Sequence, residues 1–275
     1  MPAIILRSCP LCDLDNSHSP AHAHSPAEWP LKRCVMCGFV YLERAAAYEE
    51  MAENFAWEKT SSAETARRTS AEPIKQIVSD SLKRLRRDIL KRRKLGTLLR
   101  AYIAPGAVAD IGCGSGKGLQ QLPDTYTPVG LEISRALAAR AQRRVAKRGG
   151  RVFAGDALTG LRGLTTGELS GILMSAFLEH EIQPRALLTE AHRALQPGGR
   201  IIIKVPNFAS WNRALRGARW CGYRFPDHVN YFTPRSLTRL ARETGFRVLR
   251  CHLWDRLPTS DNLWMVLEKQ DRPAH

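Results

Sequence analysis

The stretch VADIGCGSGKGL, residues 108–119, constrains the fold of this chain more than any other. A short apolar run ends in Asp110 and is followed by three alternating glycines, Gly112, Gly114 and Gly116. Glycine has no Cβ and adopts positive φ angles, so such a turn either closes tightly or lets the backbone lie directly against a ligand. The stretch predicts a buried strand, a tight turn and the start of a helix.

Alternating strand and helix signals follow this turn. Short apolar runs such as ILMSAF and IIIKV are typical of strands covered by helices on both faces. The strands are expected at 107–111, 127–132, 151–154, 172–177, 200–205, 247–253 and 263–267, and the helices at 117–122, 134–148, 184–195 and 234–244. The predicted fold class is therefore α/β, a doubly wound, mostly parallel, seven-stranded sheet of the Rossmann-like type.

Two further acidic residues end the next two expected strands. Glu132 lies twenty residues beyond Gly112, where a carboxylate can accept hydrogen bonds from ribose hydroxyls, and Asp156 can receive the exocyclic amine of adenine. Asp110 would repel a pyrophosphate, so a dinucleotide fits poorly. A cationic adenosyl ligand without phosphate fits better, and S-adenosylmethionine is such a ligand.

Four motifs, VADIGCGSG, GLEIS, GDAL and LQPGGRIIIKVPN, resemble the class I S-adenosylmethionine-dependent methyltransferases across residues 105–275. The resemblance implies that Asp110 and the glycine backbone hold the methionine part, Glu132 the ribose and Asp156 the adenine. Flanking cofactor contacts are expected from Cys113, Ile133, Ala157 and Phe177. The family often opens its fourth strand with an acid, whereas this chain has Ser170, so no role is carried over to that position.

Four cysteines form two pairs near the N-terminus, Cys9 with Cys12 and Cys34 with Cys37. Pairs of this spacing bring four thiolates around one tetrahedral zinc ion, and disulfides are the weaker explanation in a reducing compartment. Residues 1–59 are therefore predicted to form a zinc-binding ribbon or knuckle. His18, His22 and His24, between the pairs, are alternative ligands or, as we favour, part of a solvated loop.

The net charge of +16 is concentrated in one segment. Residues 60–104 carry 12 Lys and Arg against 4 Asp and Glu, with apolar residues at helical spacing. They are predicted to form a basic amphipathic helical connector, either a solvated face over a core stripe or a surface that attracts nucleic acid. No apolar run is long enough for a membrane span, so we expect a cytoplasmic protein, and the sequence carries no signal for its oligomeric state.

Residues 206–234 form a long segment rich in aromatic residues and arginine, predicted to be a substrate lid, with an excursion packed on the sheet edge as the alternative. As a lid, its aromatic rings would supply a stacking surface: Trp211, Trp220, Tyr223, Phe225, Tyr231 and Phe232. His228 beside Asp227, and His180 in LEHE, are the candidate bases, with a structural role as the alternative for each. The segment PDHVNYF resembles the sugar-nucleotide C-methyltransferases, which implies that His228 acts as the base with Asp227. Phe225 stands where that group has tyrosine, and the group's long additional C-terminal domain is not seen.

These patterns predict an S-adenosylmethionine-dependent methyltransferase that acts on a small-molecule acceptor, a sugar nucleotide or another biosynthetic intermediate, by in-line displacement. A second reading keeps the enzyme and changes the acceptor to ribosomal or transfer RNA, bound through the zinc module and the basic helices. A third is a non-catalytic protein that binds the cofactor and assists assembly.

Overall fold

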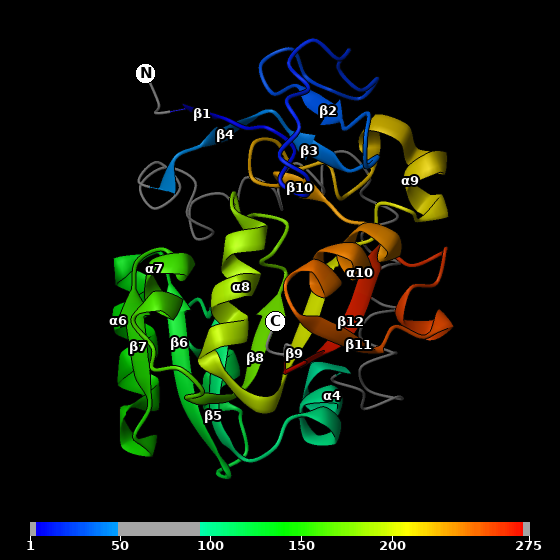
Figure 1. The fold of residues 1–275 in the computed structure, drawn as a ribbon. Helices are drawn as coiled ribbons and strands as arrows, with labels where there is room; N and C mark the ends of the chain where they lie inside the picture. Colours follow the sequence, from blue (N-terminus) through cyan, green and yellow to red (C-terminus); the bar gives the residue numbers. More distant parts are fainter. Residues whose placement is uncertain (1–3, 49–93, 272–275) are drawn as a thin grey trace, which may run out of the picture.

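The computed structural model describes residues 4–48 and 94–271 of the chain. Its centre is a seven-stranded sheet with the strand order β11-β12-β9-β8-β5-β6-β7 (Figure 1). The strands are β5 (Gly106–Ile111), β6 (Tyr126–Glu132), β7 (Arg151–Ala154), β8 (Leu169–Ser175), β9 (Leu195–Pro206), β11 (Phe246–Arg250) and β12 (Asn262–Lys269). Only β12 runs antiparallel to its neighbours β9 and β11 within this sheet. The predicted fold class and all seven predicted strands are confirmed.

Helices cover both faces of this sheet because its strands are apolar on both sides. Ala109 and Ile111 of β5 pack with α7 (Ala157–Arg162), α8 (Pro184–Ala194) and α10 (Pro234–Glu243) on one face. Val108, the residue before Ala109, packs with α4 (Lys94–Tyr102), α5 (Lys117–Gln120) and α6 (Arg135–Val145) on the other face. The four predicted helices are present, and the sequence patterns did not predict the six-residue helices α7 and α9 (Trp211–Arg216).

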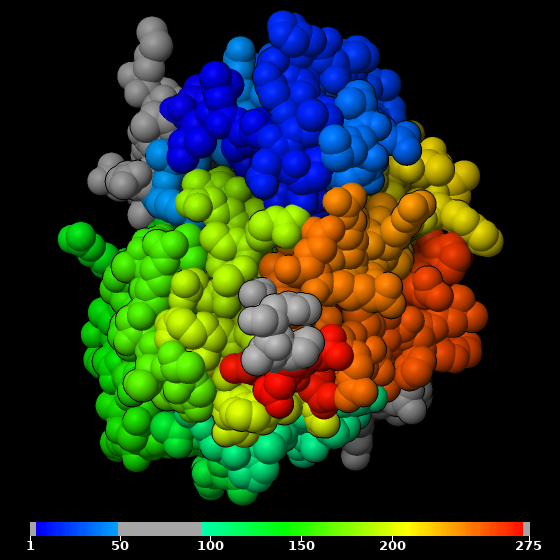
Figure 2. All heavy atoms as spheres, in the orientation of Figure 1, coloured from blue at the N-terminus to red at the C-terminus, as the bar shows by residue number. Residues whose placement is uncertain are grey.

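The N-terminal region forms short strands that join the rest of the chain. Strand β1 (Ile4–Leu6) pairs with β4 (Arg44–Ala46), and β2 (Leu31–Arg33) pairs with β3 (Val40–Leu42). Strand β10 (Asn230–Tyr231), from the predicted lid, completes the second sheet against β3. The predicted zinc module and the predicted lid therefore share one small sheet. In Figure 2 the blue N-terminal residues lie directly on the yellow-green and orange residues around α8 and α10.

The aromatic residues of segment 206–234 are mostly core residues. Trp220, Tyr223 and Tyr231 are at most 4% exposed and pack with Leu31 and Val40 of the N-terminal strands. Phe232 is also buried, whereas Trp211 in α9 (Trp211–Arg216) is 63% exposed. The expectation that these rings supply a stacking surface is wrong for the four buried ones, because they anchor the segment to the N-terminal strands.

The predicted basic connector, residues 60–104, falls largely on residues 49–93, which lie outside the described part of the chain. Its last turns are α4, where Leu98 and Leu99 are buried against the sheet. None of the helices in the described ranges combines the length and the apolar character that a bilayer crossing requires.

Candidate active site

The glycine turn after β5 meets the conformational demand that the sequence indicated. Gly112, Gly114 and Gly116 have φ angles of +73°, +55° and +78°. A Cβ on Gly112 would lie 2.8 Å from the ring of Phe177, and one on Gly116 would lie 2.8 Å from Ala141 of α6. A Cβ on Gly114 would have no neighbour within 4 Å. The outer glycines are therefore required for packing, whereas a side chain at Gly114 would meet open space.

Asp110 and Glu132 lie together at the ends of β5 and β6. The Glu132 carboxylate accepts hydrogen bonds from the backbone N–H groups of Gly114, at 2.7 Å, and Ser134, at 3.0 Å. Burial, together with the neighbouring Glu132 carboxylate, raises the pKa of Asp110 to about 7. Burial and the same two carboxylates raise the pKa of the Cys113 thiol to about 12, so this thiol stays neutral. The pair concentrates negative charge, which a cationic ligand would stabilise.

Asp156 follows β7, the next strand along the edge. Its carboxylate caps α7 by accepting a hydrogen bond from the backbone N–H of Thr159 at 2.8 Å. Ala157 after it is buried, and Ile133, after Glu132, is half-buried. The carboxyl ends of neighbouring parallel strands meet at one edge of a sheet, so the three acids lie along the same edge. Their individual cofactor contacts stay predictions.

The structure brings the two candidate histidines together. The rings of His180 and His228 lie edge to face with their centroids 4.7 Å apart. Nδ1 of His180 lies 2.9 Å from the backbone carbonyl of Asp227, and Nδ1 of His228 lies 2.8 Å from that of Gly222. Burial and the nearby Arg224 lower the pKa of His180 to about 4, so its imidazole is neutral at physiological pH.

The Asp227 carboxylate forms an ion pair with Arg224 at 2.7 Å. The sequence reading placed this carboxylate beside His228 as its orienting group. Arg224 shares the charge of Asp227, and the backbone carbonyl of Gly222 orients the His228 ring. The role of Asp227 therefore stays a prediction, with Arg224 as an additional partner.

A buried arginine holds the two histidine-bearing loops together, and sequence reasoning missed it. The Arg7 guanidinium donates to the carbonyls of Leu42, Val229 and Ile182 and, at 2.8 Å, to the side-chain oxygen of Asn230. The Asn230 side chain in turn donates to two carbonyls of the loop after β8. Arg7 and Asn230, here called the Arg7 clasp, are 223 residues apart in the sequence. No local pattern could have predicted their contact.

Two buried glutamates beside the histidines were also missed. The Glu181 carboxylate accepts a hydrogen bond from the Tyr48 hydroxyl, and burial raises the pKa of Glu181. Burial also raises the pKa of Glu179 to about 7. In the motif LEHE only the histidine was considered. The acid on each side of this histidine, directly after an apolar strand, is the sequence signal that could have identified both glutamates.

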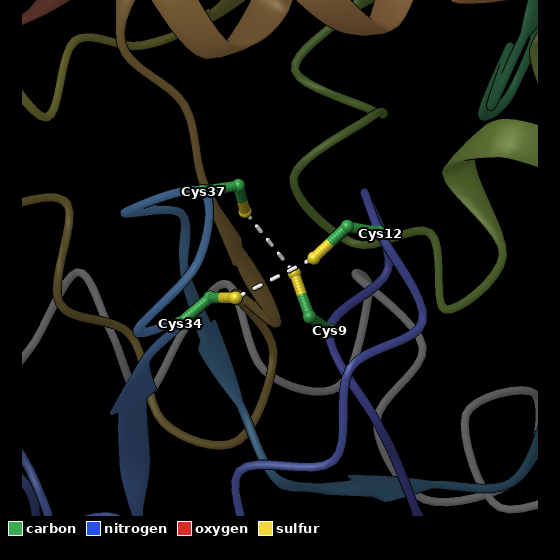
Figure 3. Close-up of side chains that lie close together, drawn as sticks. All are labelled: Cys9, Cys12, Cys34 and Cys37. Carbon is green, nitrogen blue, oxygen red and sulfur yellow. Dashed lines mark hydrogen bonds between the residues drawn. The ribbon is translucent and has the colours of Figure 1, made fainter.

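The four N-terminal cysteines converge on one point, as Figure 3 shows. The sulfur of Cys9 lies 3.5 Å from that of Cys37, and the sulfur of Cys12 lies 3.5 Å from that of Cys34. Zinc–sulfur bonds of about 2.3 Å in a tetrahedron place the sulfurs about 3.8 Å apart. All four sulfurs lie within 4.8 Å of one another, so the cluster has the dimensions of a single tetrahedral metal site.

The strand order, the single antiparallel strand beside the sheet edge and the glycine turn with acids at three strand ends define a Rossmann-like methyltransferase fold. Comparison with protein families agrees with this class. Residues 81–250 match the family described as a methyltransferase domain, and the chain belongs to that family.

Two curated relatives share part of the chain. A 37.1 kDa protein encoded in a transposon of Streptomyces fradiae is 31% identical over 155 residues, which is 52% of this chain and 44% of the relative. A protein of Methanocaldococcus jannaschii is 25% identical over 152 residues, which is 55% of this chain and 70% of the relative. The chain thus matches less than half of the length of the Streptomyces protein.

Solved structures share the fold. A S-adenosylmethionine-dependent methyltransferase of Archaeoglobus fulgidus superposes with a TM-score of 0.51 at 20% identity, over 67% of this chain and 98% of that one. One of Mesorhizobium loti superposes with a TM-score of 0.50 at 17% identity, over 63% and 96% of the two chains. At these identities the likeness concerns the fold alone.

Proposed function

We propose that the protein transfers a methyl group from S-adenosylmethionine to a small-molecule acceptor. The observation that carries the proposal is the pair of adjacent carboxylates, Asp110 and Glu132, at a glycine turn that is open at Gly114. A ligand with an ammonium and a sulfonium group would balance their charge. When bound, this cofactor supplies a methyl group on sulfonium sulfur that is open to in-line displacement.

The chain's own residues divide the work of binding. Asp110 and the backbone of the glycine turn would hold the cationic methionine part, Glu132 the ribose and Asp156 the adenine. Cys113, Ile133, Ala157 and Phe177 would flank the adenosyl group. Phe177 supports this arrangement because its ring already packs against Gly112.

His228 is proposed as the base for an acceptor that loses a proton on methylation. The contact of its Nδ1 with the Gly222 carbonyl makes Nδ1 the donor, so Nε2 carries the lone pair that accepts a proton. The neutral His180 ring lies against it, and Asp227 contributes through its backbone carbonyl, which orients His180. As the new bond forms, the acceptor's proton passes to His228.

A small acceptor is favoured over RNA by the protein that surrounds His228. Strand β10, two residues beyond His228, is paired with β3, and the Arg7 clasp ties both histidine-bearing loops to the N-terminal strands. An acceptor at His228 therefore enters a site that these strands enclose on one side. Such a site suits a sugar nucleotide or another biosynthetic intermediate better than a folded nucleic acid.

The four-cysteine cluster is proposed to hold one structural zinc ion. Its sulfur spacing fits the tetrahedral geometry, and the ion would fix the turn that leads into β3. Elemental analysis of the purified protein should find zinc bound to this cluster. A folded protein that contains no metal would contradict the assignment.

The test of the proposed function separates the cofactor from the acceptor. Calorimetric titration with S-adenosylmethionine should show binding that Glu132→Ala weakens and that the exposed control Asp124→Ala leaves unchanged. A radiolabelled methyl group should pass to a small-molecule extract, and His228→Gln should abolish this transfer while cofactor binding persists. Label in bulk tRNA instead would refute the small-molecule acceptor, and no cofactor binding would refute the enzyme.

A further inference from the structure

Three side chains at the acceptor end of the sheet form a ligand set that resembles a metal site. Glu179 and His180 follow β8, and His228 precedes β10. One potential ligand atom from each of the three lies within 4.8 Å of the others. Two imidazoles and one carboxylate are a common ligand set for divalent transition metals in proteins, and such sites keep further coordination positions open.

The hydrogen bonds of the histidines are those of metal-ligating imidazoles. In such sites the second ring nitrogen usually donates to a carbonyl or a carboxylate, which fixes the tautomer and the ring orientation. Nδ1 of His180 and Nδ1 of His228 each lie within 3 Å of a backbone carbonyl, those of Asp227 and Gly222. The Nε2 atoms of both rings therefore carry the lone pairs.

Glu179 supplies the independent observation. Its side chain is 1% exposed, and its Oε2 atom has no hydrogen-bond partner within residues 4–48 and 94–271. A buried carboxylate oxygen without a partner costs free energy unless it is protonated or binds a cation. Lys204 and Arg224 lie close enough to stabilise its charge, but Arg224 is already paired with Asp227 at 2.7 Å. The oxygen thus lacks a direct ligand beside two oriented imidazoles.

We propose that Glu179, His180 and His228 bind one divalent transition-metal ion, such as Zn²⁺ or Co²⁺, at a second site distinct from the four-cysteine cluster. Bonds of about 2.1 Å hold two ligand atoms at most about 4.2 Å apart, so the ion would draw these side chains slightly together. The ion and a proton compete for Nε2 of His228. The metal-bound form therefore lacks the base, and the ion inhibits methyl transfer, a consequence that rests on the proposed function.

The first test counts metal ions in the full-length protein. After equilibration with Zn²⁺ and desalting, the wild type should retain one more zinc ion per chain than Glu179→Gln or His228→Gln. His24→Gln is the matched control, because His22 and His24 form a second histidine pair, with ring centroids 5.6 Å apart. This control should bind as much zinc as the wild type. Equal zinc in the wild type and in His228→Gln, or loss of the second ion in His24→Gln, would overturn the proposal.

The second test does not depend on the folding of any variant. Co²⁺ added to protein whose cysteine cluster holds zinc should give ligand-field bands without thiolate charge transfer, because the proposed ligands are nitrogen and oxygen. A thiolate band, or no band, would refute the site.

Calorimetry with S-adenosylmethionine checks that each variant of the first test is folded. Methyl transfer is measured separately, so a second ion in a protein without activity would support this site and count against the proposed function.

Discussion

Replacing Arg7 with methionine should destabilise the protein strongly. Arg7 is 9% exposed, and its guanidinium donates four hydrogen bonds across three segments of the chain. Each hydrogen bond from a charged donor contributes about 1.5–3 kcal/mol, but such contributions do not add. Removing one member of a buried ionic cluster costs about 3–5 kcal/mol, and Arg7→Met also leaves Glu181 without this cationic neighbour. We therefore expect a loss of about 3–5 kcal/mol in the free energy of unfolding.

Urea unfolding measures this loss, and hydrogen exchange locates it. The control is Arg44→Met, an exposed arginine opposite Leu6 in the neighbouring strand, which should change stability by at most about 0.5 kcal/mol. In Arg7→Met the amides of Val229 and Asn230, which donate to the Glu179 carbonyl, should exchange faster. If the two variants unfold within about 1 kcal/mol of each other, the Arg7 clasp does not hold the loops as we argue.

Three further outcomes are expected. A methyl group on Gly130 would lie 2.8 Å from the Cys113 sulfur, so Gly130→Ala should lower the free energy of unfolding by about 1–3 kcal/mol. The control Gly163→Ala should be tolerated, because the nearest atom to its new methyl group would be 3.5 Å away. Equal urea midpoints for the two variants would contradict this packing argument. Because the pKa of Asp110 is raised from 3.8 to about 7, the folded protein binds a proton that the unfolded chain releases, so stability without cofactor should fall as the pH rises through this interval. Asp110→Asn should flatten that part of the melting temperature profile, and an unchanged profile would show that Asp110 does not titrate there. Zinc removal by a chelator should increase amide exchange in β3 and β10, which adjoin the cysteine cluster through the chain or the small sheet, and leave α6, which packs on the large sheet, protected. Uniform exchange would argue against a local structural role.

Local sequence patterns were sufficient for the central sheet and its glycine turn. Apolar runs and the conformational demand of alternating glycines act within a few residues, so β5, the turn at Gly112 and the helices after it could be predicted from them. The spacing of the cysteine pairs likewise predicted the convergence of their sulfurs. Helices α7 and α9 were missed because six residues cover less than two helical turns and show no usable periodicity, whereas the still shorter α5 was predicted from the glycine turn before it.

Only the tertiary structure decided how the surroundings of His180 and His228 are assembled. The composition of segment 206–234 indicated that its aromatic residues matter. Composition is the same whether such rings are buried in the core or exposed to a substrate, and the structure shows that Trp220 is buried. The pairing of β10 with β3 and the contact of Arg7 with Asn230 join segments about two hundred residues apart, and such contacts leave no periodic trace in either segment. The sequence by itself therefore determined that Asp110, Glu132 and Asp156 lie along one edge of the sheet, because they end or follow its successive parallel strands. The surroundings of His180 and His228 depend on packing between distant segments, which only the folded chain defines.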